Sequence, residues 1–164
     1  MGKKLFFLLV LVCICVLLVC ETTTRQSEIA ATYGDGDIAA TSIWTEDFQY
    51  ALRRSQESAK PIFILFTGSD WCPPCMALDN EVFTQPEFAE YANQNFILFK
   101  ADRPRFIEQS ETLVEQNQEL FRRFEIVGVP TIKIINYREN VLATTGYRAG
   151  GVLNYINHIK ELLK

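Results

Sequence analysis

Trp71-Cys72-Pro73-Pro74-Cys75 places two cysteines two residues apart, directly after the apolar residues 61–66. The apolar segment predicts a strand buried on both faces, and prolines after Cys72 are typical of the first turn of a helix. Cys72 is therefore expected to lie exposed at a strand-to-helix junction, where the helix dipole and free N–H groups favour a thiolate. Thiol–disulfide exchange is the leading hypothesis, with Cys75 better placed to resolve a mixed disulfide than to start one.

Two other interpretations of the cysteine pair compete with this one. Half of a zinc site is one, but a structural zinc site needs four ligands, and beyond Cys75 the chain has no further cysteine and only one histidine, His158. A purely structural disulfide is the other. Its loop would enclose only two residues, so it would constrain the unfolded chain very little.

The first twenty residues have the pattern of an export signal. Lys3 and Lys4 precede an apolar run over residues 5–20, and a polar stretch follows. The run is short for a spanning helix, which needs about 20 residues. Residues 17–20 also resemble a lipoprotein cleavage box, although Val19 stands where a small residue is usual. A cleaved signal peptide, lipid attachment at Cys20 and an uncleaved anchor are all open alternatives.

Cysteine usage and charge narrow the class of protein. Three of the five cysteines lie in the leader, so the exported part keeps only Cys72 and Cys75, too few for a disulfide-stabilised scaffold. Without Lys3 and Lys4, 14 basic and 20 acidic residues remain, a formal charge of −6. No basic patch suggests nucleic-acid binding.

The remaining chain predicts a flexible linker followed by one α/β domain. Residues 21–42 are rich in Thr, Ser, Gly, Ala and Asp, a composition that buries little apolar surface. Residues 43–164 alternate strand and helix patterns in the order β-α-β-α-β-α-β-β-α. The expected architecture is a central mixed sheet with parallel strands, an antiparallel hairpin near the C-terminus and helices on both faces. The expected strands are 43–44, 61–67, 95–101, 131–135 and 141–144.

The segment Gly128-Val129-Pro130-Thr131 precedes the expected hairpin. Together with the cysteine motif, at this separation, it resembles the thioredoxin superfamily over roughly residues 43–164. Within the superfamily, residues 59–61, 99–102 and 103–124 are similar to small exported thioredoxins and to the periplasmic C-terminal domain of the transmembrane thiol reductase DsbD. The leader and length are also similar to those of a chlamydial member.

The resemblance implies a role for each matching residue. Cys72 would be the nucleophile, Cys75 the resolving thiol and Trp71 a shield beside the pair, with Pro73 and Pro74 supporting the active site. Substrate binding would fall to Val129, Pro130 and Thr131. Pro130 would follow a cis peptide bond, leaving the backbone of Val129 exposed to pair with an extended substrate. An ordinary rigid turn at Val129-Pro130 is the alternative.

One departure from the family concerns the proton acceptor. Many thioredoxins carry a buried Asp six residues before the first cysteine, where this chain has Phe66, and Phe66 is expected to lie beneath the active-site helix. Asp70, Glu81 and Asp102 are candidate acceptors, but each also fits a solvated surface acid. Lys100 matches a lysine that in the family neighbours this Asp, so in this chain Lys100 lacks its usual acidic partner.

The sequence thus predicts an exported thiol–disulfide oxidoreductase that uses Cys72 and Cys75 without a metal or organic cofactor. No acidifying His stands between the cysteines, so reduction or isomerisation is favoured over net oxidation. The expected partners are disulfide-containing exported proteins and a membrane thiol reductase of the DsbD type, and the chain is expected to be a periplasmic monomer, soluble or tethered to the inner membrane. A redox-inert peptide-binding or chaperone module is the second hypothesis.

Overall fold

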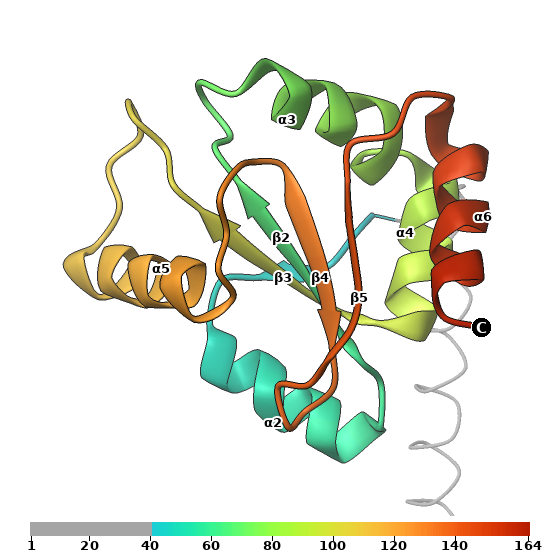
Figure 1. Ribbon diagram of the computed structural model, residues 1–164, viewed down its shortest axis with the longest axis horizontal. Helices are drawn as coiled ribbons and strands as arrows, with labels where there is room; N and C mark the ends of the chain where they lie inside the picture. Colours follow the sequence, from blue (N-terminus) through green and yellow to red (C-terminus); the bar gives the residue numbers. More distant parts are fainter. Residues whose placement is uncertain (1–40) are drawn as a thin grey trace, which may run out of the picture. The chain divides into compact units, whose positions relative to one another are not determined.

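The computed structural model describes residues 41–164, so the expected leader and residues 21–40 of the expected linker lie outside the described residues. The described residues form a five-stranded mixed sheet in the order β1-β3-β2-β4-β5 (Figure 1). β1 and β2 run parallel to β3, whereas β4 is antiparallel to both β2 and β5. The strands are β1 (Trp44–Thr45), β2 (Ile62–Thr67), β3 (Ile97–Asp102), β4 (Thr131–Ile135) and β5 (Val141–Gly146).

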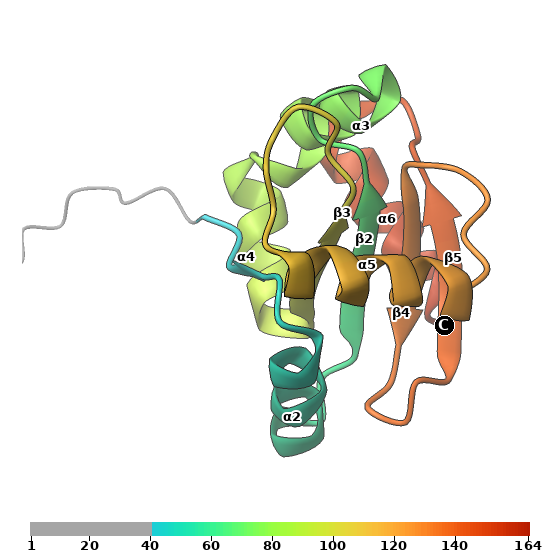
Figure 2. The same cartoon turned by 90° about the vertical axis from the view of Figure 1, so that its left-hand side faces the viewer.

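Helices cover both faces of the sheet, as Figure 2 shows from the α5 side. One face carries α2 (Phe48–Ser58) and α5 (Glu111–Arg123). The other carries α3 (Pro73–Leu78), the π-helix η1 (Asp79–Phe83), α4 (Pro86–Asn95) and α6 (Gly151–Leu162). The predicted α/β architecture is therefore confirmed. Within residues 41–164 no helix is long and apolar enough to cross a membrane.

The central strand β2 supplies both cores, because successive side chains of a strand point to opposite faces. Phe63 and Leu65 join the cluster beneath α3, α4 and α6. Ile62, Ile64 and Phe66 join the cluster on the α2 and α5 side. All five side chains are buried, as the continuous apolar run predicts.

The strand ends bring three connecting segments to one edge of the sheet. Thr67, at the end of β2, pairs with Asp102 at the end of β3, and Phe66 pairs with Thr131 at the start of antiparallel β4. The segment after β2, the segment after β3 and the segment before β4 therefore meet at this edge. The cysteine motif lies in the first of them.

The helical region after the cysteines breaks near residues 84–86, as predicted. The N–H of Thr84 donates to the carbonyl of Asp79, five residues back, at 3.0 Å, and this bond widens the last turn into η1. Pro86 lacks an N–H and starts α4, with Gln85 as the extended residue before it. The active-site helix is consequently a short α3–η1 unit that ends before α4.

Candidate active site

The two cysteines lie at the start of α3. Cys72 is the N-cap residue, and Pro73 and Pro74 occupy the first two helical positions, where no N–H is needed. A disulfide joins Cys72 to Cys75, with their Cα atoms 5.2 Å apart. The N–H of Cys75 points at the Cys72 sulfur, at an N–Sγ distance of 3.3 Å. The same N–H would stabilise a Cys72 thiolate after reduction.

Both cysteines are buried in the disulfide form. The relative exposure of Cys72 is 3% and that of Cys75 is 5%, so the prediction of an exposed Cys72 is wrong for this disulfide form. The backbone before Pro130 covers the sulfur, because Cys72 Sγ lies 3.7 Å from the carbonyl oxygen of Val129.

The Val129–Pro130 peptide bond is cis, in agreement with what the family resemblance implies. Val129 and Pro130 are both half-buried next to the disulfide. The Thr131 hydroxyl donates to the carbonyl of Gly128 at 2.7 Å. Thr131 therefore holds the shape of this segment.

Trp71 lies between two segments of the site. Its indole N–H donates to the carbonyl of Arg103 at 2.8 Å, and the Arg105 guanidinium lies 4.1 Å from the centre of its ring. On the other side the ring contacts Gly68 so closely that a Cβ atom there would overlap with it. Gly68 is thus required for this packing, and Trp71 fastens the segment after β3 to the cysteine motif.

Asp70 holds the same segment by a different interaction. Its carboxylate accepts the N–H groups of Arg105, Phe106 and Ile107 at 2.7 to 3.1 Å. Desolvation alone would raise the pKa of Asp70, but these backbone hydrogen bonds outweigh it and the pKa is lowered. Asp70 therefore stays ionised, and its lone pairs are already engaged.

The other two candidate acids also have partners. Asp102 is nearly buried and accepts the N–H of Ser69 at 3.0 Å. The Glu81 carboxylate accepts the Tyr147 hydroxyl at 3.1 Å and 3.2 Å, and this hydrogen bond raises the pKa of Tyr147. A cavity borders Cys75, and neither of these two carboxylates lines it.

Metal binding finds no support in the part of the chain that the structure describes. Among residues 41–164, no three His, Cys, Asp or Glu side chains lie close enough together to hold a metal ion. His158 lies on α6, where its Nε2 is 2.9 Å from the Thr145 hydroxyl.

Comparison with known proteins decides the family. Residues 43–136 match the family model described as Thioredoxin-like. The chain belongs to the thioredoxin-like family. It is 30% identical to the "Disulfide bond reductase DsbH" of Chlamydia pneumoniae over 152 residues, which cover 93% of this chain and 92% of the relative.

Solved structures support the same fold for this thioredoxin-like chain. The structure titled "DsbH Oxidoreductase" is 30% identical, with a TM-score of 0.74, and the match covers 80% of this chain and 92% of that one. The oxidised C-terminal domain of Neisseria meningitidis DsbD is 14% identical with a TM-score of 0.51, covering 70% of this chain and 91% of that domain. The second match shows the fold alone.

A cavity of about 170 Å³ borders Cys75 on the α3 side of the sheet. Leu65 and Lys100, which pair across β2 and β3, lie on its wall. Asp79 lines it as well, four residues beyond Cys75 and so on the same face of the helical unit. The cavity has room for several water molecules.

The expectation that Phe66 lies beneath the active-site helix is wrong. Its ring packs against Phe121 of α5, with the ring centres 5.1 Å apart, on the opposite face of the sheet. The residue facing the cavity is its neighbour Leu65. Phe66 stands six residues before Cys72, where many thioredoxins have Asp, but its side chain points to the face of the sheet away from α3. Side chains alternate along β2, so the length of the loop between β2 and Cys72 decides which of them faces the cysteines. The position of Asp79 beside Cys75 was not predicted, because in the sequence Asp79 resembles any exposed acid of a helix.

Proposed function

We propose that this chain reduces or isomerises disulfides of exported proteins through the Cys72–Cys75 couple. The observation that carries the proposal is the disulfide at the start of α3, with its Cys72 sulfur against the carbonyl of Val129, next to the cis bond to Pro130. The family and the relative named disulfide bond reductase support it. No metal or organic cofactor is required, because the dithiol itself carries the two electrons.

The reaction starts from the reduced pair. The Cys72 thiolate attacks one sulfur of the substrate disulfide, forming a mixed disulfide and releasing the other substrate sulfur as a thiolate. The Cys75 thiolate then attacks Cys72 Sγ, which forms the Cys72–Cys75 disulfide and releases the second substrate sulfur. Two electrons and two protons pass from the protein to the substrate, whose disulfide becomes two thiols.

Substrate docking involves the segment before β4. With the bond to Pro130 in the cis form, the backbone of Val129 pairs with an extended substrate as a short antiparallel strand. This pairing places the substrate sulfur over Cys72. Trp71, held by Arg103 and Arg105, limits the approach from the other side.

Deprotonation of Cys75 needs an acceptor, and we assign this role to Asp79. Asp79 lines the cavity beside Cys75, whereas Asp70 and Asp102 are engaged by backbone N–H groups. Water in the cavity would carry the proton from the thiol to the carboxylate. Lys100 lies on the wall of the same cavity.

The oxidised protein must be reduced again by a thiol donor, for which a membrane reductase of the DsbD type is the candidate. The leader pattern of residues 1–20 supports a periplasmic location, with residues 43–164 as the catalytic domain. Insulin reduction tests the proposal. Turnover with a reductant is expected, and no turnover by a folded protein with an intact cysteine pair would favour a redox-inert peptide-binding module.

A further inference from the structure

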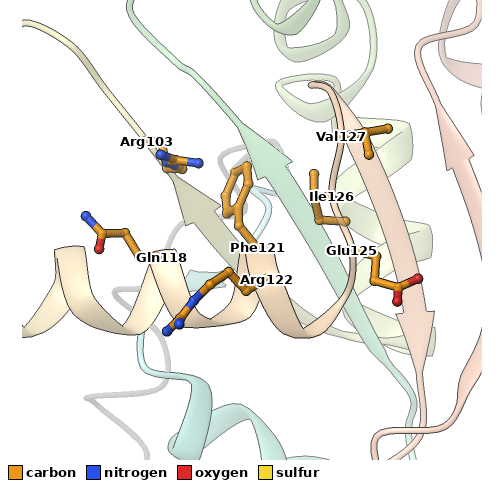
Figure 3. A pocket seen from close by; sticks show the side chains of 7 residues that line it. All are labelled: Arg103, Gln118, Phe121, Arg122, Glu125, Ile126 and Val127. Carbon is orange, nitrogen blue, oxygen red and sulfur yellow. The ribbon is translucent and has the colours of Figure 1, made fainter.

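A groove of about 620 Å³ lies between the C-terminal half of α5 and the segment that leads to β4. Figure 3 shows the Phe121 ring in its centre, with Arg103 and Gln118 to one side and Ile126 and Val127 to the other. Phe121 is almost buried and forms an apolar floor, while Val127 is fully exposed. The groove therefore offers apolar surface to a side chain from outside.

Both sides of the groove connect directly to the active site. The carbonyl of Arg103 accepts the indole N–H of Trp71, the residue before Cys72. Val127 stands two residues before Val129, whose carbonyl oxygen lies 3.7 Å from Cys72 Sγ. A polypeptide bound at Val129 would thus pass the groove within a few residues of its cysteine.

The groove is cationic although the chain as a whole is acidic, with a formal charge of −4. Arg103 lies 4.8 Å from the centre of the Phe121 ring, and Arg122 lines the same groove. Among residues 41–164, carboxylates pair with Arg54 and Arg123 but not with either of these arginines. The single carboxylate in the lining is that of Glu125, which leaves a net positive charge.

We propose that this groove is a substrate subsite for an acidic side chain, most suitably glutamate, near the reacting cysteine of a polypeptide. The aliphatic part of the side chain contacts Phe121, and the carboxylate lies between the guanidinium groups of Arg103 and Arg122. This inference rests on the proposed function and deepens it, since it names the sequence that the enzyme prefers.

The direction of the substrate follows from antiparallel pairing with Val129. In such a pair, residues after the substrate cysteine lie beside residues before Val129. With about 3.3 Å per extended residue, the acidic side chain belongs two or three positions C-terminal to the substrate cysteine.

The test uses two sets of fluorogenic peptides joined by a disulfide, with Glu, Gln or Lys at the second position after the cysteine in one set and at the third position in the other. We expect the reduced protein to react at least about threefold faster with the Glu peptide than with the Lys peptide at low salt, with a smaller ratio at high salt. In Arg103→Gln/Arg122→Gln the ratio of the Glu-peptide rate to the Lys-peptide rate should fall to about one. Arg122→Glu, an exposed change at the end of α5, should reverse the preference.

The matched control is Arg53→Gln/Arg138→Gln, which removes the same charge from exposed positions outside the groove. It should keep the preference for Glu. Equal rates with Glu and Lys peptides in the unmodified protein would overturn the inference, and so would an equal effect when Glu precedes the cysteine. If even the Gln peptide is not reduced, the proposed function itself fails, which is a distinguishable result.

Discussion

The carboxylate of Asp70 accepts the backbone N–H of Phe106 at 2.7 Å, thirty-six residues away in the chain. Two further N–H groups, of Arg105 and Ile107, point at the same carboxylate. A residue next to the cysteine motif thereby fixes the segment after β3, and this segment supplies the Arg103 carbonyl that holds Trp71. The active-site surface depends on a contact that involves no reacting group.

Asp70→Asn should release this segment without unfolding the domain. An amide presents one acceptor oxygen and no charge to three N–H donors, so the contact weakens. Trypsin reports the change directly, because it cleaves after Arg105 but not at Arg103, which precedes Pro104. We expect cleavage after Arg105 to become about tenfold faster, in line with the loss of one or two charge-assisted hydrogen bonds. Unchanged cleavage would show that Asp70 does not hold the segment.

The lowered pKa of Asp70 also predicts the sign of a pH effect. A carboxyl whose pKa is lower in the folded than in the unfolded state stabilises the fold at pH values above the unfolded pKa, about 4. This contribution is lost as the pH falls through the folded pKa. The difference in unfolding free energy between the unmodified protein and Asp70→Asn should therefore be constant from pH 7 to about 5 and shrink below about pH 4.

The two cysteines should differ in what their removal traps. In chains whose leader cysteines are changed to Ser, Cys75→Ala should accumulate mixed disulfides with partner proteins, because no thiol remains to release them. Cys72→Ala should accumulate none, because the attacking thiolate is missing. Non-reducing electrophoresis with and without dithiothreitol measures both. Equal trapping by the two variants contradicts the division of labour.

Asp79 should matter for release and not for attack. Asp79→Asn removes the carboxylate from the cavity beside Cys75, so we expect release of a preformed mixed disulfide to slow on the order of tenfold near neutral pH. Stopped-flow kinetics from pH 6 to 9 should show the difference vanish at high pH, where Cys75 ionises without help. Glu81→Gln is the matched control, because this exposed acid contacts Tyr147 and lies outside the cavity. A rate for Asp79→Asn equal to that of the unmodified protein would exclude Asp79 as the acceptor.

The domain should remain folded when the disulfide is reduced. Its stability comes from apolar clusters on both faces of the sheet, and the Cys72–Cys75 bond closes a loop of only two intervening residues. Thermal unfolding in excess reductant should remain cooperative, with Tm lower by about 10 °C or less. Unfolding at room temperature on reduction would instead support a structural disulfide.

The parts of the fold that the sequence predicted are those with local signals. The apolar run of β2, the prolines after Cys72 and the break at Pro86 each carry their own pattern, and the structure has all three. The face on which Phe66 lies could not be predicted, because a one-residue difference in the loop before Cys72 reverses every side chain of the strand. The contacts of Asp70 and Trp71 with residues 103–107 join segments that are far apart in the sequence. A pattern of neighbouring residues therefore could not predict them.

The reduction potential of the Cys72–Cys75 couple tests the central claim most directly. Equilibration with glutathione or dithiothreitol buffers, followed by alkylation of free thiols and mass spectrometry, measures it. A reductase without an acidifying residue between its cysteines should have a potential more negative than about −180 mV, toward the −270 mV typical of thioredoxin. A value near −120 mV, typical of a strong oxidant, would contradict the account. The Cys72–Cys75 disulfide would then oxidise substrate thiols, whereas the account requires the reduced pair to reduce substrate disulfides.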